Sequence, residues 1–150
     1  MSGCRGRITA AELRRIASYV MDQQEVAKGV TAEIVLGDSD TVRELNRLYR
    51  GRDEPTDVLS FAAHEGDFFQ ESPDEAPSLG EVIVCLPVAE AQATAAGRAV
   101  QGEIAHLLVH GLLHIMGHDH EDPAEGEEMK QREDTLLEAL GYAGGYEHGH

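Results

Sequence analysis

The chain contains little cysteine and no long apolar segment, and each absence excludes a class of protein. Cys4 and Cys85 are its only cysteines and form no C-x-x-C pair, so we expect neither a disulfide framework nor a thiolate zinc site. No apolar run approaches the roughly 20 residues of a membrane-spanning helix, and the N-terminus lacks the apolar region of a signal peptide. With 150 residues, the sequence predicts a single cytoplasmic domain that does not act at a membrane.

Basic residues are also scarce. The chain has 12 lysines and arginines against 28 aspartates and glutamates, which gives a formal net charge of −16. Such a charge argues against broad attraction to nucleic acid or anionic lipid, so any polyanion must be bound locally. One local group of basic residues is present within ten positions: Arg43, Arg47, Arg50 and Arg52. For Arg43 and Arg47 taken alone, a solvated helix surface is an equally good interpretation.

Three histidines near the C-terminus carry the clearest functional pattern. His110 and His114 are four residues apart, so on a helix they lie on one face and can direct their imidazoles at a common point. Gly117 follows, where a residue with positive φ would end the helix and bring His120 round as a third ligand. Three neutral imidazoles with one open position are typical of a catalytic zinc site, whereas a structural site has four protein ligands.

This spacing also matches the metzincin metalloproteases, whose helix reads H-E-x-x-H-x-x-G-x-x-H. The match fails at one position, because Gly111 stands where those proteases carry the glutamate that accepts a proton from water. A peptidase or another hydrolase therefore remains an alternative, but a disfavoured one. We expect the metal to be kept and the chemistry to differ.

Other polar residues surround this pattern. His106 lies one turn before His110, and we expect it to support a ligand or to fill a structural place. Asp119 could orient a ligand imidazole, although a solvated turn residue is an equal alternative, and His118 lies on the same turn. We assign no role to the remaining histidines, which lie in loop or tail sequence: His64, His148 and His150.

Hydrophobic periodicity predicts both helices and strands along the chain. The helix over 100–116 is apolar nearly all round, so it should be central, and the acidic segment over 64–79 reads as a surface loop. The helix that follows Gly37-Asp38-Ser39-Asp40 carries Val42, Leu45 and Leu48 and delivers Arg50 at its end. We expect a core over about 9–142, with flexible ends at 1–8 and 143–150. Further helices are predicted over 10–24, 87–97 and 123–141, and strands over 32–36, 58–62 and 81–86.

Two long motifs, together with a shorter one, resemble a known family. The run from His110 to His120, the segment Leu45-Asn46-x-x-Tyr49-Arg50-Gly51-x-Asp53-x-Pro55-Thr56-Asp57-Val58-Leu59-Ser60-Phe61 and the strand Gly80-Glu81-Val82-Ile83 are similar to the bacterial YbeY family of metal-dependent endoribonucleases. The resemblance covers about 32–142. It implies an α+β, zincin-like single domain, in which a small mixed β-sheet packs against about five helices with a central metal-binding helix.

The resemblance also implies roles for individual residues. His110, His114 and His120 match the family's zinc ligands, and Arg50 matches the arginine beside the metal, which makes Arg50 and His110 the expected catalytic residues. The implied partners are precursor ribosomal RNA, small-subunit components and an Era-type GTPase. Family members usually open with a β-strand before the first helix. The segment 1–8 has little apolar alternation, so the sequence leaves open whether that edge strand exists.

A mechanism follows as a hypothesis. Zinc held by three neutral histidines can activate water as a nucleophile or as a base toward an RNA 2′-hydroxyl, and Arg50 can hold phosphate oxygens through a bidentate contact. The alternative for Arg50 is a structural role at a helix C-terminus. Asp57 and Glu81 are candidates for caps, loop bracing or support of a ligand. Imidazole also suits nickel, copper and iron, so the sequence does not name the metal.

Two kinds of function fit this site. The first is a zinc-dependent, single-strand-specific endoribonuclease in the maturation and quality control of small-subunit (16S) ribosomal RNA. The second is a ribosome assembly factor whose metal mainly holds the fold together.

Overall fold

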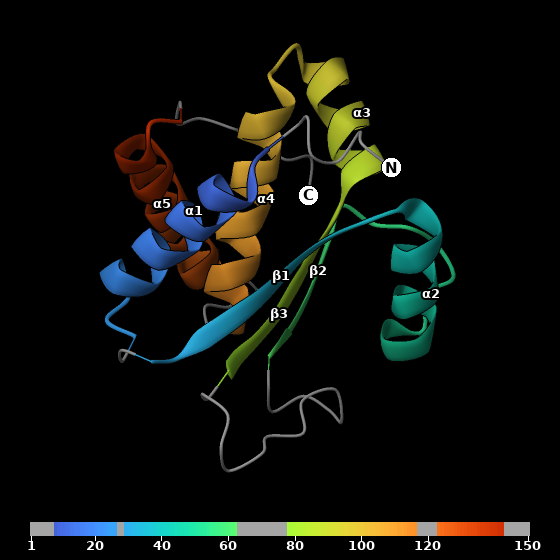
Figure 1. Ribbon diagram of the computed structural model, residues 1–150, viewed down its shortest axis with the longest axis horizontal. Helices are drawn as coiled ribbons and strands as arrows, with labels where there is room; N and C mark the ends of the chain where they lie inside the picture. The colour runs from blue at the N-terminus through green and yellow to red at the C-terminus, as the bar shows by residue number, and fades with distance from the viewer. Residues whose placement is uncertain (1–7, 27–28, 63–77, 117–122, 143–150) are drawn as a thin grey trace.

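The computed structural model describes residues 8–26, 29–62, 78–116 and 123–142. Within them the chain forms five helices and three strands, which Figure 1 shows in their arrangement in space. The fold class is therefore α+β, as predicted. In chain order the elements are α1 (Ala10–Gln23), β1 (Thr31–Gly37), α2 (Ser39–Arg50), β2 (Val58–Ala62), β3 (Ser78–Cys85), α3 (Leu86–Ala96), α4 (Val100–Ile115) and α5 (Pro123–Leu140).

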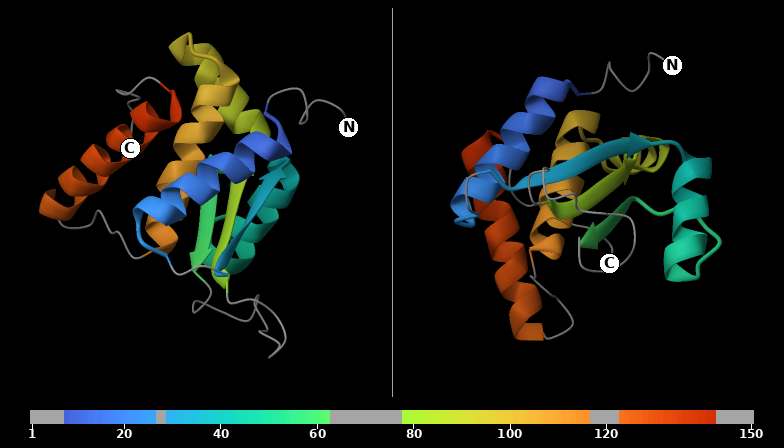
Figure 2. Two further views of the ribbon diagram at one scale, coloured as in Figure 1. Left: turned by 60° about the vertical axis from the view of Figure 1, so that its left-hand side comes forward. Right: turned by 60° about the horizontal axis from the view of Figure 1, so that its bottom comes forward.

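The three described strands form one mixed sheet in the order β1-β3-β2. β3 is central, parallel to β1 and antiparallel to β2. Helices α1, α4 and α5 lie on one face of the sheet, and α2 lies on the other (Figures 1 and 2). Alternate residues of β3 accordingly serve two cores, because Val82 and Val84 join the α4 side while Ile83 and Cys85 join the α2 side.

Helix α4 occupies the centre of the larger core, as its apolar sequence predicts. All but a few of its residues are buried, and it packs against the sheet, α1, α3 and α5. A helix that is apolar nearly all round can bury its side chains only in such a central position. Ile8, which precedes α1, is buried in the same core.

Helix α2 begins and ends with strong local signals. The Asp38 carboxylate accepts a hydrogen bond from the Thr41 backbone N–H at 2.7 Å, and Gly51 ends the helix in the left-handed conformation that favours glycine. Val42 is buried as expected, but Leu48 is 56% exposed. The predicted apolar stripe therefore stops before the end of the helix.

The predicted elements agree with the structure to within one residue at each end, apart from the start of β3. The strand begins at Ser78, so Ser78 and Leu79 belong to the sheet and not to the predicted loop. Leu86, predicted as the end of this strand, opens α3 instead, where Pro87 fits the first turn. The rest of that loop, the predicted flexible ends and the question of an N-terminal strand in 1–7 lie outside the described residues.

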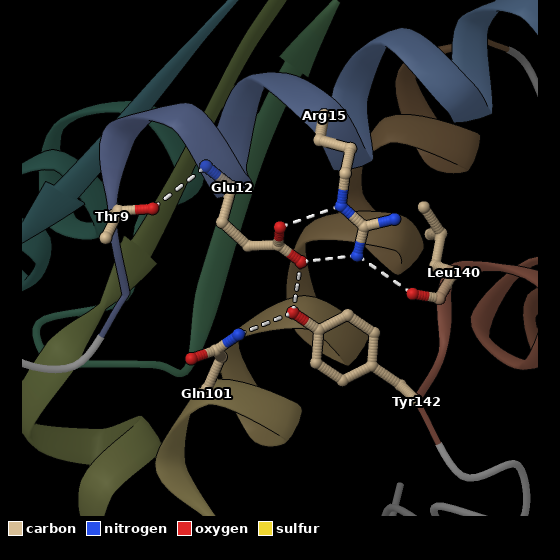
Figure 3. A network of polar contacts seen from close by, with 6 residues as sticks. All are labelled: Thr9, Glu12, Arg15, Gln101, Leu140 and Tyr142. Carbon is tan, nitrogen blue, oxygen red and sulfur yellow. Dashed lines mark hydrogen bonds and ion pairs between the residues drawn. The ribbon is translucent and has the colours of Figure 1, made fainter.

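A polar network joins the two ends of the fold (Figure 3). Thr9 caps α1 by accepting a hydrogen bond from the Glu12 backbone N–H at 3.0 Å. The Glu12 carboxylate binds the Arg15 guanidinium, which also donates to the Leu140 carbonyl at 2.8 Å. The start of α1 is thereby fastened to the end of α5.

Tyr142 completes this network from the segment after α5. Its hydroxyl donates to the Glu12 carboxylate at 2.5 Å and accepts from the Gln101 side chain at 2.9 Å. The Arg15 and Tyr142 hydrogen bonds outweigh burial and lower the pKa of Glu12 to about 2. α1, α4 and the C-terminal end of α5 therefore share one charged junction.

Within the described ranges, no helix combines the length and the apolar character that crossing a bilayer requires.

Candidate metal centre

Two of the three predicted metal ligands lie next to each other on α4. The His110 and His114 rings have their centroids 6.3 Å apart, as one helical turn between them predicts. The His110 side chain is 24% exposed and His114 is exposed, so both are at the accessible end of a helix that is otherwise buried. His120, Gly117, His118 and Asp119 lie outside the described residues, and their predicted roles stay predictions.

A buried glutamate on α5 contacts two successive turns of α4, the turns that carry His106 and His110. The Glu133 carboxylate is 2.6 Å from His110 Nδ1 through one oxygen and 3.1 Å from His106 Nε2 through the other. Burial alone would raise the pKa of Glu133, but its hydrogen bonds to the two imidazoles outweigh burial and hold the pKa at about 2. The site thus contains an ionised carboxylate that joins two histidines.

The chemistry of these donors fits a metal ion. With Nδ1 of His110 directed at a carboxylate, Nε2 is the ring nitrogen that can bind a metal, and a carboxylate behind a histidine is the usual support of a zinc ligand. Within the described parts of the chain, no three histidine, cysteine, aspartate or glutamate side chains converge on one point by themselves. The third predicted ligand, His120, is not among these described residues.

Gly111, the residue that replaces the peptidase glutamate, faces the sheet. A Cβ atom at this position would lie 2.7 Å from Val82 Cγ1 and 3.4 Å from Val58 Cγ2. A side chain at 111 would thus point into the core of α4 and the sheet. The packing explains why the chain has no glutamate there and disfavours a peptidase mechanism of the metzincin kind.

The Arg50 guanidinium contacts the Phe61 ring and the backbone of β2. Its Cζ lies 4.7 Å from the centre of the Phe61 ring, and its Nη2 donates to the Ser60 carbonyl at 2.8 Å. Val58 of the same strand, β2, packs beside Gly111 on the other face of the sheet. Arg50 and α4, the helix that carries the histidines, therefore contact β2 from opposite faces of the sheet.

The neighbouring arginines of α2 have carboxylate partners of their own. Arg43 binds Asp53 at 2.8 Å, and Arg47 binds Glu44. These side chains are about half exposed, and the partners lower the pKa values of Asp53 and Glu44. The interpretation of Arg43 and Arg47 as a solvated, ion-paired surface is the one that the structure favours.

Asp57 and Glu81 have different surroundings. Asp57 is nearly buried and accepts a hydrogen bond from the Gln92 side chain at 3.3 Å, so it braces the segment before β2 against α3. Glu81 lies on β3 opposite Glu33 of β1. Burial and the Glu33 charge raise the pKa of Glu81. The loop-bracing alternative thus describes Asp57, and the structure places Glu81 beside another carboxylate.

Sequence reasoning missed Glu133, although a signal was present. On α5, Glu133 follows Met129 by four residues and precedes Leu137 by four, so it lies on the buried face of the helix. A charged residue in register with an apolar stripe is almost never buried without a partner. His106, which we expected to support a ligand or to fill a structural place, is buried and shares this carboxylate with His110.

Comparison with known proteins identifies the family. The family model described as Endoribonuclease YbeY matches residues 5–141. A protein named Endoribonuclease YbeY from Dehalococcoides mccartyi (strain BAV1) is 42% identical over 141 residues, which cover 89% of this chain and 88% of the relative. One of the same name from Halorhodospira halophila is 40% identical and covers 93% and 90%.

A solved structure supports the same fold. The solution structure of TM1509 from Thermotoga maritima superposes with a TM-score of 0.55 at 26% identity, over 87% of this chain and 84% of that protein. The fold, the matched residues and the two histidines on α4 agree with the resemblance seen in the sequence. The chain belongs to the YbeY family of endoribonucleases, which are hydrolases that act on RNA.

Proposed function

We propose that this endoribonuclease depends on zinc, is specific for single-stranded RNA, and acts in the cytoplasm on precursor 16S ribosomal RNA. Its task would be the maturation and quality control of the small ribosomal subunit, with small-subunit components and an Era-type GTPase as protein partners. Family membership supports the reaction class. The arrangement around α4 supports the dependence on a metal.

The observation that carries this proposal is the contact between Glu133 and His110. The carboxylate is 2.6 Å from Nδ1 of a ligand candidate whose neighbour on the same helix face is a second one, His114. A carboxylate that contacts the ring nitrogen facing away from the metal is the usual support of a histidine ligand. We assign the metal to His110, His114 and His120, with the remaining position open to solvent and substrate.

The chain's own residues divide the chemistry between them. When bound, zinc would supply a Lewis acid that polarises a phosphoryl oxygen and activates water. His110 would hold the ion with Nε2 while Glu133 holds its Nδ1 proton. Arg50 presents a planar cation whose orientation is fixed by Phe61 and Ser60, and it would bind the phosphate oxygens as negative charge builds on them.

Tyr49 supports the specificity for unpaired RNA. Tyr49 is 49% exposed, and its ring forms a T-shaped contact with the buried Phe61 ring, with centroids 5.8 Å apart. A fixed aromatic surface next to a phosphate-binding arginine suits a base that is not stacked in a duplex, and such stacking contributes about 1–3 kcal/mol per base. The net charge of −16 opposes non-specific binding. Local contacts of this kind must therefore supply the affinity.

Cleavage of a labelled single-stranded RNA by zinc-loaded protein tests the proposal. We expect His114→Ala and Arg50→Glu each to lower the rate by at least about 100-fold. Arg47→Glu is the matched control, because it makes the same charge change on the same helix, and it should retain most of the activity. Equal cleavage by the parent and both variants, or cleavage that survives removal of zinc, would refute the assigned site.

The assembly-factor alternative predicts a different result. A protein whose metal is mainly structural would lose its fold when zinc is removed and would bind small ribosomal subunits without cleaving RNA. Circular dichroism of the metal-free chain, together with co-sedimentation with small subunits, separates these two functions.

A further inference from the structure

Glu133 touches two histidines at once, and only one of them is a candidate metal ligand. Its side chain comes from α5, whereas His106 and His110 lie one turn apart on α4. The two contacts use different carboxylate oxygens, at 3.1 Å to His106 Nε2 and 2.6 Å to His110 Nδ1. The carboxylate therefore spans one helical turn of α4, and its position is fixed at both oxygens.

The hydrogen bonds determine where the imidazole protons reside. An ionised carboxylate has only acceptors, so each ring nitrogen that it contacts must carry the proton. His106 is then protonated on Nε2 and His110 on Nδ1. A neutral His110 with its proton on Nδ1 has its lone pair on Nε2, the nitrogen that a metal ion requires.

The burial of Glu133 argues for a role beyond packing. Its residue exposure is 6%, and its neighbours on the same face of α5 are Met129, Leu136 and Leu137. An apolar residue there would continue the stripe without desolvating a charge, and replacing buried ionic groups by apolar ones of similar size is often neutral or stabilising. A carboxylate at this position is explained by what it does to the histidines.

We propose that Glu133 is a positioning residue that holds His110 in the Nδ1–H tautomer and aims its Nε2 at the metal ion. His106 is the second anchor, which keeps the carboxylate from rotating away from His110. This inference rests on the proposed metal site, but the tautomer that it assigns to His110 belongs to the metal-free chain as well. The two ideas can therefore fail separately.

The first experiment needs no variant of Glu133. Two-bond ¹H–¹⁵N correlation spectra of the metal-free full-length chain report the tautomer of each histidine, with His110→Gln used to assign the signal. We expect the Nδ1–H form of His110 to predominate and the Nε2–H form of His106 to predominate. A dominant Nε2–H form of His110 would overturn the inference, whatever the behaviour of the variants.

The second experiment measures zinc affinity by competition with a chromophoric chelator. Glu133→Gln keeps the size of the side chain but leaves only one acceptor oxygen, so we expect zinc binding to weaken by about 10–100-fold. Glu138→Gln, an exposed position on the same helix, makes the same charge change and should bind zinc like the parent. Circular dichroism and thermal melting establish that both variants fold.

The outcomes separate this inference from the proposed function. If the parent and Glu133→Gln bind zinc equally well, Glu133 does not position the ligand, while the metal site itself stands. If the parent binds no zinc but its spectrum shows the expected tautomers, the positioning contact stands and the metal-dependent function fails. If the Glu133→Gln chain does not fold, its zinc affinity does not test the positioning role. The histidine tautomers of the parent then support or refute the inference directly.

Discussion

At the scale of single residues, Gly111 shows that core packing and metal-binding side chains occupy different positions on α4. His110 and His114 lie at the accessible part of the helix, whereas position 111 is pressed against Val82 and Val58 of the sheet. A glutamate there would need a buried site that the sheet already fills. The same helix can therefore hold a metal-binding pair without the base that a peptidase uses.

Gly111→Ala tests this packing. Alanine gains about 1 kcal/mol of helix propensity over glycine, but its Cβ would lie 2.7 Å from Val82 Cγ1, and overpacking a core costs about 1–3 kcal/mol. Because valine has few rotamers with which to move aside, we expect a net loss of about 1 kcal/mol in the free energy of unfolding, measured in urea. Adding Val82→Ala should restore part of the lost stability, and a more stable single variant would contradict the packing.

Tyr49 provides the second test at this scale. We expect Tyr49→Ala to weaken binding of a short single-stranded RNA by about 5-fold or more, since a stacked base is worth about 1–3 kcal/mol. Tyr49→Phe should bind like the parent, because it keeps the ring and removes only the hydroxyl. Fluorescence anisotropy at fixed salt measures both variants. If Tyr49→Phe were as weak as Tyr49→Ala, the hydroxyl and not the ring surface would be responsible.

At the scale of elements, α2 carries two kinds of arginine. Arg43 and Arg47 bind carboxylates within α2 or just after it, whereas Arg50 lies across a ring and an edge strand. The sequence shows all three on one helical face and cannot show which are neutralised. The local basic group is therefore weaker as a phosphate-binding surface than its spacing predicts.

Releasing these arginines should strengthen RNA binding. Asp53→Asn and Glu44→Gln remove the partners of Arg43 and Arg47, so each freed guanidinium can neutralise a phosphate. For single-stranded RNA we expect tighter binding at low salt and a logarithmic salt slope steeper by about 0.7 per added phosphate contact. Glu138→Gln, with the same change of charge on α5, should leave the slope unchanged. An unchanged slope in Asp53→Asn and Glu44→Gln would place these arginines away from the bound RNA.

Secondary structure could be predicted from the sequence wherever local signals were strong. The cap at Asp38, Pro87 in the first turn of α3 and the periodicity of α4 all agree with the structure. The start of β3 could not be predicted, because Ser78 and Leu79 join the sheet through pairing with distant strands. Tertiary contacts decide such limits, and local propensity does not.

The candidate site was predictable in part for the same reason. His110 and His114 are close in sequence and on one helix, so spacing alone brings them together. The link from Glu133 to His110 joins α4 to α5 across 23 residues, which no local rule provides. Arg50 could be linked to the site only through family resemblance, since its contacts are with β2, another element of the fold.

At the scale of the whole molecule, the excess of acidic groups makes charged contacts between distant elements important. Most of the 28 acidic residues add to self-repulsion, which opposes the compact state. The junction of Glu12, Arg15 and Tyr142 acts in the opposite sense, because it fastens α1 to α4 and to the end of α5 (Figure 3). The strength of this junction depends on the ionisation of the Glu12 carboxylate.

The pH dependence of stability measures this junction. The pKa of Glu12 is lowered from 4.5 to about 2 in the folded chain, so its contribution is fully present above the unfolded-state pKa and is lost as pH falls from about 5 to 2. The Glu12 side chain is 18% exposed and Arg15 is half exposed. Solvent screening therefore limits the expected contribution to about 1 kcal/mol.

The experiment compares the parent with Glu12→Gln from pH 7 to pH 2 by urea unfolding, because other carboxylates also titrate in this range. We expect the parent to be more stable by about 1 kcal/mol at pH 7 and the difference to vanish near pH 2. Glu128→Gln, an exposed position on α5, should show a difference that changes little with pH. A Glu12→Gln difference that persists at pH 2 would mean that the junction stabilises the fold through its shape and neutral hydrogen bonds, and not through the charge of Glu12.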